Sequence, residues 1–377
     1  MRSEQCKKLT NISSHIRFNP YTVNPNLILS LVEILELKFG AVWEKFSLPR
    51  GLRDWLDPIA WVDTLETWRE SRQLIPSTWS RVLLAAKRPA VVRALIDGEK
   101  LTEENFCEIG INKDLLSDFT TAAIFRKTDN GEYIPMIRLT RLFGEWFISD
   151  PACDLSEDAV YIGRDSIRLA RRAILFSKGT VLDAYAGTGI QGILANRRGA
   201  RVIFAELNPR AIAMCRINLF LAGITNGKII ELDSFEGIRS RFDLILANPP
   251  YGAESVSTRP LALSHSGGIH GDEETFRILD SLPRLLKPDG RALIVGTYLF
   301  EDNAPHIFLS QTDLDLTFEA EREDIELRNN LKQRFFGVLT ASHGTGRRRY
   351  IRTYMLRRIA EKISRVIRIG VMQVNME

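Results

Sequence analysis

The second half of the chain alternates apolar segments with segments of helical periodicity, and this alternation constrains the fold most strongly. Five segments have the composition of buried strands: GTVLDAYAG, ARVIFAEL, KIIEL, FDLILANPP and RALIVGTYL. Patterns such as PRAIAMCRINLFLAG and TFRILDSLPRLLK separate them. Buried strands separated by helices are typical of a parallel, doubly wound sheet. We therefore predict an α/β domain over residues 151–377 that binds its ligand beyond the carboxyl ends of the strands.

The first 150 residues have a different character and are expected to form a separate region. Residues 1–90 are predicted to be mostly helical, and all six tryptophans fall within the first 146 residues. Within residues 53–70, Trp55, Trp61 and Trp68 recur with other apolar residues at nearly helical spacing, which favours packing in a core over an aromatic ligand box. Residues 90–150 combine helical segments with a hairpin around Thr128-Asp129-Asn130-Gly131, which predicts a partly winged-helix-like module.

A winged-helix-like module can bind DNA, select a substrate or form a homodimer. The predicted helices carry no obviously basic recognition surface, which disfavours DNA binding. We expect residues 1–150 to select the substrate, with homodimerisation as a further use.

Composition and charge indicate the cellular compartment and the partners of the protein. The 377 residues carry a net charge of +4, with nine basic residues and one acid between Arg347 and Arg368. The four cysteines are scattered without a CxxC pair, which suits a reducing compartment. No apolar stretch reaches the roughly 18 residues of a membrane span, and the N-terminus lacks a signal-peptide core. We expect a cytoplasmic protein without a membrane partner.

The first candidate site is the turn Asp183-Ala-Tyr185-Ala-Gly187-Thr-Gly189, which follows a strand and opens a helix. The glycines would let the backbone approach a ligand closely. The turn has neither full GxGxxG spacing nor the Gly-Lys-Ser/Thr of a phosphate loop. The acid at the strand end favours a cationic ligand without phosphates over a dinucleotide.

Two further acids follow the next strands. Glu206 ends the second strand, where a carboxylate can accept both hydroxyls of a ribose. Asp233 follows the third strand, where it could accept a hydrogen bond from an adenine amine. Glu231 and Glu236 are nearby alternatives to Asp233 for that contact.

The most specific motif is Asn248-Pro249-Pro250-Tyr251, directly after the fourth strand. The prolines fix the backbone and remove two N–H donors. The Asn248 side chain and the carbonyl near Pro249 can then accept from one planar NH₂ group, while Tyr251 stacks on its plane. This arrangement would free the nitrogen lone pair to attack an electrophile.

These residues resemble the class I S-adenosylmethionine-dependent methyltransferases over about residues 160–300. The resemblance rests on the acid and glycines of the first turn, Glu206, and the Asn-Pro-Pro-Tyr motif. Enzymes with that motif methylate glutamine amides of translation release factors, or exocyclic amino groups of adenine and guanine in nucleic acids. The segment from Tyr161 through Asp165 and Ser166 is similar to one that precedes the first motif in the glutamine group and in bacterial methyltransferases with a winged N-terminal region.

The resemblance implies a Rossmann-like, seven-stranded domain with S-adenosylmethionine as cofactor and no metal. Asp165, Ser166, Tyr185 and Asn248 would lie at the cofactor, although Tyr185 stands where the glutamine group often has glycine. The resemblance also implies that the remaining residues divide between the parts of the cofactor and the acceptor. The methionine part would contact Asp183, Gly187 and Gly189, the ribose Glu206, the adenine Asp233, and the acceptor Asn248, Pro249 and Tyr251.

Three functions remain open at this point. The first is N-methylation of a peptide or small molecule, and the second is methylation of an RNA or DNA amino group, using the basic segment. The third is non-methylating sulfonium chemistry such as cyclisation of the cofactor. His265 and His270, in a glycine-rich loop, could act as general bases, but a polar lid is the favoured interpretation. The basic segment is interpreted as a late strand with a solvated basic face.

Overall fold

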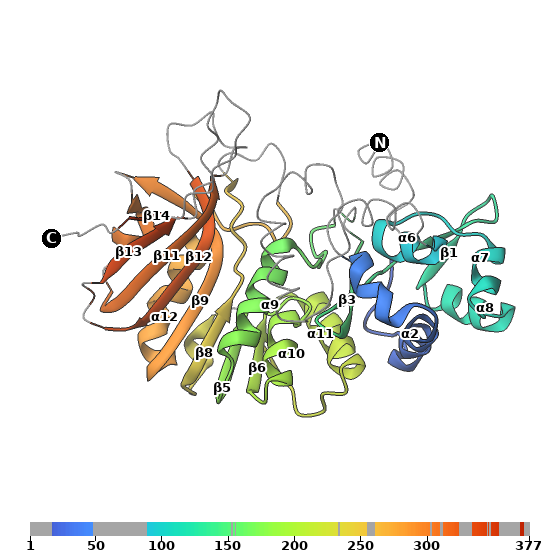
Figure 1. Ribbon diagram of the computed structural model, residues 1–377, viewed down its shortest axis with the longest axis horizontal. Coiled ribbons are helices and arrows are strands. Elements are labelled where there is room, and N and C mark those ends of the chain that lie inside the picture. Colours follow the sequence, from blue (N-terminus) through green and yellow to red (C-terminus); the bar gives the residue numbers. More distant parts are fainter. Residues whose placement is uncertain are drawn as a thin grey trace, which may run out of the picture. The chain divides into compact units, whose positions relative to one another are not determined.

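The chain divides into two compact units, Met1–Asp154 with Phe220–Ala222 and Leu155–Leu219 with Gly223–Glu377. A computed structural model shows both units (Figure 1). It describes residues 17–47, 89–151, 154, 156–232, 234–254, 261–301, 304–309, 312–323, 334–344, 346, 348–353 and 370–372. Four of the six tryptophans, Trp55, Trp61, Trp68 and Trp79, lie outside these ranges.

In the first unit the described helices come first along the chain and two hairpins follow. The described helices are α2 (Pro25–Ser47), α6 (Ala90–Asp97), α7 (Glu103–Glu108) and α8 (Lys113–Thr121). Helix α7 begins with a capping box, in which the Thr102 side chain accepts from the Asn105 N–H and the Asn105 side chain accepts from the Thr102 N–H. The predicted hairpin is confirmed as β1 (Phe125–Lys127) and β2 (Tyr133–Pro135), which pair antiparallel around the Asn130-Gly131 turn.

Aromatic side chains hold these helices and the first hairpin together. The ring of Phe106 lies 4.9 Å from that of Phe125 and 5.3 Å from that of Tyr133, both edge to face. Phe119 packs against Phe125 at 6.1 Å. Such edge-to-face contacts add to the free energy gained by burying the rings.

A second hairpin, which the sequence did not predict, completes the unit. Strands β3 (Arg138–Leu142) and β4 (Glu145–Ser149) pair antiparallel. The indole N–H of Trp146 donates to Glu36 of α2 at 2.8 Å, and Arg141 forms an ion pair with the same carboxylate. Trp146 therefore packs a hairpin against a helix, as expected for a structural tryptophan.

The second unit contains one long sheet, and the predicted Rossmann-like fold is confirmed. Its strand order is β7-β6-β5-β8-β9-β12-β11-β13-β14. The first five strands in this order are parallel, and β12 then runs antiparallel to β9 and β11. The bounds are β5 (Thr180–Ala184), β6 (Arg201–Glu206), β7 (Lys228–Glu231), β8 (Phe242–Ala247), β9 (Leu286–Glu301), β11 (Leu314–Glu323) and β12 (Arg334–His343).

The sheet continues beyond the seven expected strands. Strand β13 (Arg349–Thr353) pairs parallel with β11, β14 (Gly370–Met372) pairs with β13, and β10 (Ala304–Pro305) pairs with the end of β9. The late strand predicted in the basic segment is therefore confirmed for residues 349–353. The Arg349 guanidinium donates to the backbone carbonyls of Phe308 and Thr312, so this arginine holds the sheet edge in place.

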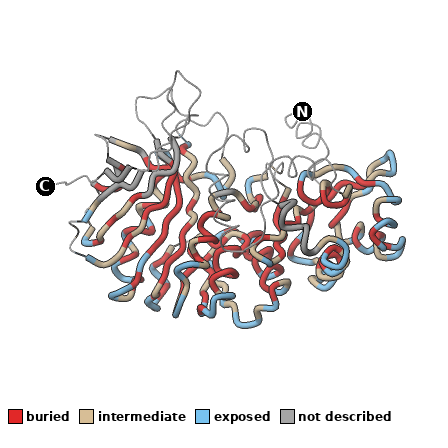
Figure 2. Tube along the Cα trace, viewed as in Figure 1, coloured by how far each residue is buried: buried red, intermediate tan, exposed pale blue. Residues whose placement is uncertain are grey.

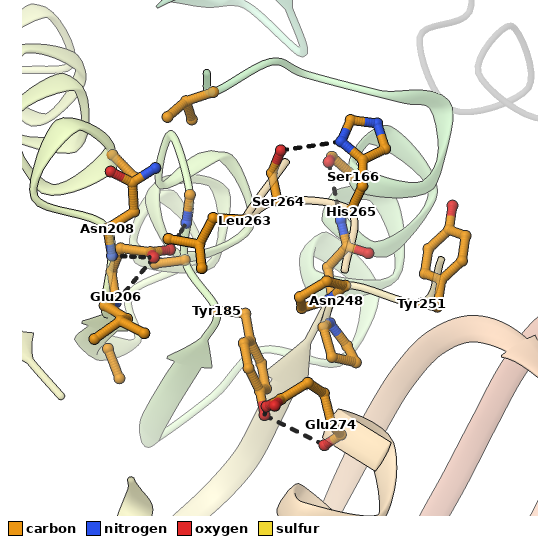
Figure 3. Close-up of a pocket in the computed structure, with 18 of the residues that line it drawn as sticks. Ser166, Tyr185, Glu206, Asn208, Asn248, Tyr251, Leu263, Ser264, His265 and Glu274 are labelled. Carbon is orange, nitrogen blue, oxygen red and sulfur yellow. Dashed lines mark hydrogen bonds between the residues drawn. The ribbon is translucent and has the colours of Figure 1, made fainter. Parts of the chain in front are cut away.

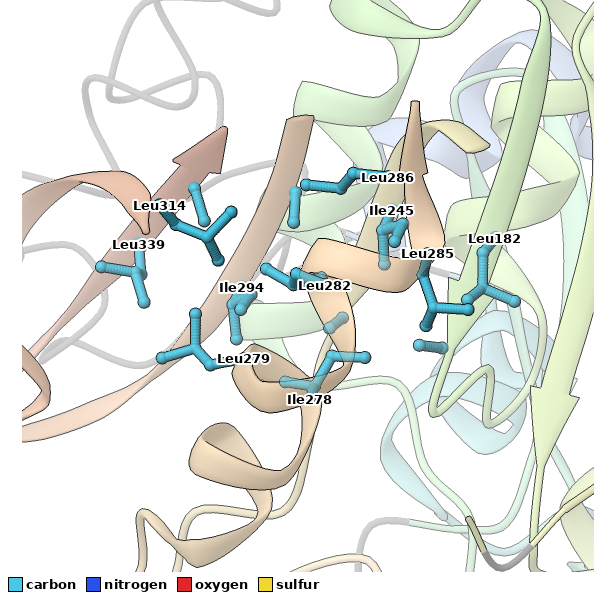
Figure 4. Packing of buried hydrophobic residues seen from close by; sticks show 14 of the residues in the cluster. Leu182, Ile245, Ile278, Leu279, Leu282, Leu285, Leu286, Ile294, Leu314 and Leu339 are labelled. Carbon is cyan, nitrogen blue, oxygen red and sulfur yellow. The ribbon is translucent and has the colours of Figure 1, made fainter. Parts of the chain in front are cut away.

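Different helices cover the two faces of the sheet (Figure 1). Helix α12 (Glu273–Leu285) packs against Leu182 and Ile245 (Figure 4), whereas α9 (Arg164–Phe176) and α10 (Ile190–Arg197) contact β5, β6, β8 and β9. Because successive strand residues point to opposite faces, Val181 and Leu244 are buried on the side away from α12. Figure 2 shows these strands buried along most of their length.

Helix α11 (Pro209–Leu221) follows β6 along the chain.

Within the described ranges, no helix combines the length and apolar character that a bilayer span requires.

Substitution of Leu282 in α12 tests this packing. Leu282 is fully buried in the cluster against β8 and β9, so Leu282→Ala should lower the free energy of unfolding by about 2–5 kcal/mol. The matched control is Leu175→Ala in α9, whose side chain is 60% exposed and should change it by less than about 0.5 kcal/mol. Urea denaturation followed by fluorescence measures both, and equal effects would contradict the packing described.

Candidate functional site

A cavity of about 260 Å³ lies at the carboxyl ends of β5, β6 and β8, within the second unit (Figure 3). Residues directly after each strand line it, and the glycine-rich loop and the start of α12 complete the wall. A parallel sheet binds its ligands at this edge, where the strand order reverses around β5. The predicted location of the ligand site therefore coincides with a cavity.

Asp183 lies behind the first turn. Its side chain is fully buried and does not line the cavity. One carboxylate oxygen, Oδ2, accepts from the Gly192 N–H in the first turn of α10 at 2.8 Å. The other, Oδ1, is buried without a hydrogen-bond partner among the described residues. Burial raises the pKa of Asp183 well above its ordinary value. In this geometry Asp183 fixes the start of α10.

The two predicted glycines of this turn have different surroundings. A Cβ at Gly187 would have no atom within 4 Å, and the residue lines the cavity, so its backbone is open to a ligand. A Cβ at Gly189 would lie 2.6 Å from Cys215 Sγ, and Gly189 does not line the cavity. Glycine is therefore needed at 189 for packing under a φ of +81°.

Glu206 is held firmly at the end of β6. Its Oε1 accepts from the backbone N–H groups of Leu207 and Asn208, both at 2.9 Å, and its Oε2 accepts from the Gly187 N–H at 2.7 Å. Burial raises the pKa of Glu206, and these three hydrogen bonds lower it in part. A carboxylate has about four acceptor positions, so one remains for a ligand hydroxyl rather than the two that the sequence suggested.

The Asn248 side chain faces the cavity, and its NH₂ group is hydrogen-bonded whereas its oxygen is bonded by no described residue (Figure 3). Nδ2 donates to Ser166 Oγ at 3.0 Å. Oδ1 is buried and has no partner within the described part of the chain. The structure thus brings the predicted residues Ser166 and Asn248 together, although 82 residues separate them. An acceptor oxygen fixed in this way is suited to receive an N–H group.

Tyr251 is anchored at both ends of its side chain. Its hydroxyl donates to Asp165 Oδ2 at 3.3 Å, and its ring packs at 6.0 Å and 58° to that of Phe336 in β12. Pro249, Pro250 and Tyr251 all line the cavity. Asp165, predicted at the cofactor, and Tyr251, predicted at the acceptor, are therefore in direct contact.

The glycine-rich loop lies directly against the Asn-Pro-Pro-Tyr motif. The Gly252 N–H donates to the His265 carbonyl at 2.7 Å, and the Gly267 N–H donates to the Gly252 carbonyl at 2.9 Å. A Cβ at Gly252, Gly267 or Gly271 would lie 2.5 to 2.7 Å from backbone atoms of the facing segment. These glycines are required by the close approach of the two backbones.

Tyr185 has an unusual conformation for a bulky residue. Its φ is +59°, a left-handed conformation that normally costs about 1 kcal/mol or more outside glycine. Its hydroxyl donates to Glu274 Oε2 at 2.9 Å, and Glu274 forms an ion pair with Arg277 at 3.0 Å. Burial raises the pKa of Tyr185 far above its usual range. All three side chains line the cavity, so Tyr185 joins the first turn to α12.

Gln191, Glu274 and Tyr161 are among the cavity-lining residues that the sequence did not predict as site residues. Gln191, the second residue of α10, is 2% exposed, and its Oε1 is buried with no partner among the residues described. Its one sequence signal is an isolated polar residue directly after the glycine turn. Asp233, in contrast, was predicted as a site residue and lies outside the described residues, between Leu232 and Ser234, which both line the cavity.

Known proteins match this part of the chain. The family model described as methyltransferase small domain matches residues 168–299. A putative protein N5-glutamine methyltransferase of Methanocaldococcus jannaschii is 32% identical over 139 residues, which cover 36% of this chain and 70% of the relative. A tRNA1(Val) (adenine(37)-N6)-methyltransferase of a Shewanella strain is 28% identical over 212 residues, 53% of this chain and 83% of the relative.

Among solved structures, a ribosomal protein L11 methylase of Lactobacillus delbrueckii subsp. bulgaricus is 18% identical, with a TM-score of 0.34 over 49% of this chain and 81% of that one. The family model spans the first turn, Glu206 and the Asn248 motif, and the Methanocaldococcus relative matches over most of its own length. The chain therefore belongs to the class I methyltransferases of the methyltransferase small domain family, enzymes that use S-adenosylmethionine.

Proposed function

We propose that the protein methylates a planar nitrogen, the amide or amine of a peptide or small molecule, held against Asn248. The observation that carries this proposal is the buried Asn248 Oδ1, which has no partner among the described residues, while Ser166 fixes the other half of the amide. A buried acceptor without a hydrogen bond costs about 1–3 kcal/mol. An N–H of the bound acceptor would relieve that cost and leave the nitrogen lone pair directed away from the asparagine.

The cavity has the features that the cofactor requires. Glu206 keeps one free acceptor position for a ribose hydroxyl, and the open space above Gly187 admits a ligand close to the backbone. The buried Gln191 Oε1, which has no partner among the described residues, suits the charged amino-acid end. Bound there, S-adenosylmethionine supplies an electrophilic methyl group and a thioether leaving group. The protein's part would be mainly to orient the acceptor nitrogen in line with that methyl group.

The remaining predicted residues fit supporting roles around this arrangement. Asp165 anchors Tyr251, so the aromatic ring has a fixed position beside the acceptor. Asp183 and Gly189 shape the turn from behind, and Tyr185 ties it to α12. We keep Asp233 as the residue that contacts the adenine.

We also propose that residues 1–150 select the acceptor. The family model begins only at residue 168, and the Methanocaldococcus match covers 36% of the chain. The N-terminal unit therefore stands outside the shared catalytic part, as a region that determines specificity would.

The second candidate acceptor is the adenine amino group of an RNA. The observation in its favour is the set of relatives whose names specify adenine-N6 methylation of a tRNA. The geometry at Asn248 suits an exocyclic amine as well as an amide. The basic segment lends less support, because Arg349 is engaged by backbone carbonyls and residues 354–369 lie outside the described ranges.

The two candidates are separated by direct assay. The full chain is incubated with methyl-labelled S-adenosylmethionine and either a glutamine-containing peptide or an adenine-containing RNA, and mass spectrometry locates the label. RNA methylation should weaken steeply with added salt, since phosphate contacts release counterions, whereas peptide methylation should not. Release of methylthioadenosine without any acceptor would instead support cyclisation of the cofactor and contradict the proposal.

Substitution of Asn248 tests the acceptor contact. Asn248→Ala should lower the rate of methyl transfer about 100-fold, because the acceptor nitrogen loses its orienting partner. Affinity for S-adenosylhomocysteine, measured by calorimetry, should change less than about threefold. The control Asn196→Ala removes an asparagine side chain of α10 that donates to the Ala200 carbonyl and does not line the cavity, and it should keep wild-type turnover. Unchanged turnover in Asn248→Ala would refute the acceptor site.

Two cofactor fragments test how the cofactor is oriented. Gln191→Ala should weaken S-adenosylhomocysteine about tenfold and leave 5′-methylthioadenosine unaffected, since the latter lacks the amino-acid end. Glu206→Ala should weaken both, because both carry the ribose. Calorimetry measures the four affinities. Equal losses of both ligands in Gln191→Ala would contradict its assignment to the amino-acid end.

A further inference from the structure

A tyrosine and a histidine form a hydrogen-bonded, stacked pair in the cavity wall. Tyr161 Oη lies 3.1 Å from His265 Nε2, and the two rings stack with centroids 5.1 Å apart and planes 19° apart. Both residues line the same cavity as Asn248 and Tyr251. The Asn-Pro-Pro-Tyr motif does not include either of them, and the orientation of the acceptor described above does not use them.

The hydrogen bonds around His265 favour one tautomer of its ring. Ser264 Oγ donates its one proton to the Ala159 carbonyl at 3.1 Å, so it can only accept from His265 Nδ1, 3.2 Å away. We therefore assign the ring proton to Nδ1; Figure 3 draws the contact between Ser264 and His265. Nε2 of the neutral ring is then an acceptor, and Tyr161 donates its hydroxyl proton to it. The hydrogen bonds therefore all run in one direction. Tyr161 donates to His265, His265 donates to Ser264, and Ser264 donates to the Ala159 carbonyl.

This chain lies at the end of the cavity that holds the acceptor motif. The His265 carbonyl accepts from the Gly252 N–H, next to Tyr251. Asp165, at the start of α9, accepts from the Tyr251 hydroxyl and acts electrostatically on both Tyr161 and His265. Further acidic residues in the described parts of these segments are Glu157 and Asp158, just before Tyr161, Asp272 and Glu273, at the end of the glycine-rich loop, and Glu254, which accepts from Ser266.

We propose that Tyr161 and His265 form a relay that removes the proton released by the acceptor nitrogen when it is methylated. This inference rests on the proposed function. The nitrogen forms its bond to the methyl carbon as the carbon–sulfur bond breaks, and it becomes positively charged. It then passes a proton to Tyr161 Oη, the Tyr161 proton moves to His265 Nε2, and the resulting imidazolium releases a proton to water at the exposed mouth of the cavity.

The electrostatics of the pair favour this direction. Burial raises the pKa of Tyr161 to about 12, so its hydroxyl keeps a proton to donate. Burial lowers the pKa of His265 below its ordinary 6.5, so the ring is neutral and able to accept at neutral pH. The negative charge of Asp165 acts in the opposite sense and stabilises the imidazolium once it forms. Activity should fall as the pH drops through the lowered pKa of His265, because a protonated ring cannot accept.

The experiment combines nitrogen NMR of the full chain with methyl transfer to the glutamine-containing peptide and the adenine-containing RNA. The NMR spectrum should show His265 as the Nδ1–H tautomer, with a pKa below 6.5, and Tyr161→Phe should change its Nε2 shift. Tyr161→Phe and His265→Gln should each lower the turnover about tenfold or more on whichever probe is methylated. His265→Gln should also remove the acidic limb of the pH profile, with affinity for S-adenosylhomocysteine retained.

His270→Gln is the matched control, since His270 belongs to the same loop but does not line the cavity. It should keep both the rate and the pH profile. The opposite tautomer at His265, or an unchanged acidic limb in His265→Gln, would overturn the relay and leave the proposed function intact. Transfer to neither probe by the wild-type protein would overturn the proposed function and the relay with it, whatever the NMR shows.

Discussion

The parallel pairing of β5 with β8 is the interaction on which the site depends. Val181 to Ala184 pair with Leu244 to Ala247, so the turn at Tyr185 and the motif at Asn248 leave the sheet side by side. Because side chains alternate between faces, a shift of one residue in β5 would move Asp183 from its place under α10 into the apolar cluster against α12. The free-energy cost of burying a carboxylate among apolar side chains fixes the register of β5. The register in turn fixes the distance between the cofactor turn and the acceptor motif.

The sequence predicted the strands of the catalytic unit because their side chains are buried on both faces and read as continuous apolar runs. The sequence did not predict the β3–β4 hairpin because its turn lacks the usual pair of turn residues. Phe143 and Gly144 have φ values of +54° and +86°, as in a tight hairpin turn that normally carries Asn-Gly or Asp-Gly. A phenylalanine in the first position hides that signal, and the glutamate contact of Trp146 across more than 100 residues leaves no local pattern.

For the site, the residues that follow strand ends were predictable, since their position depends only on the order of strands. Glu206, Asn248 and Tyr251 fall into this class. Asp165 and Ser166 lie at the start of α9 instead and were indicated only by the family resemblance, and the structure brings them to Tyr251 and Asn248. The hydrogen-bonding groups that each side chain keeps available for a ligand were not predictable. Glu206 has three backbone donors, Asp183 lies outside the cavity, and the Tyr161–His265 pair depends on two loops packed together. Such facts depend on three-dimensional contacts that no spacing encodes.

The contact between the glycine-rich loop and the Asn-Pro-Pro-Tyr segment divides the loop into positions that can vary and positions that cannot. Gly252, Gly267 and Gly271 meet backbone on the other side, so any side chain there would push the motif out of place. Leu263 and Ile269, in contrast, are 46% and 61% exposed, and Leu263 lies on the cavity wall. Substitution of Leu263 can alter the shape and polarity of the cavity wall, and substitution of Ile269 the exposed surface of the loop, while the backbone of the motif stays fixed. The loop therefore offers a route by which this scaffold could acquire a new acceptor without rebuilding its chemistry.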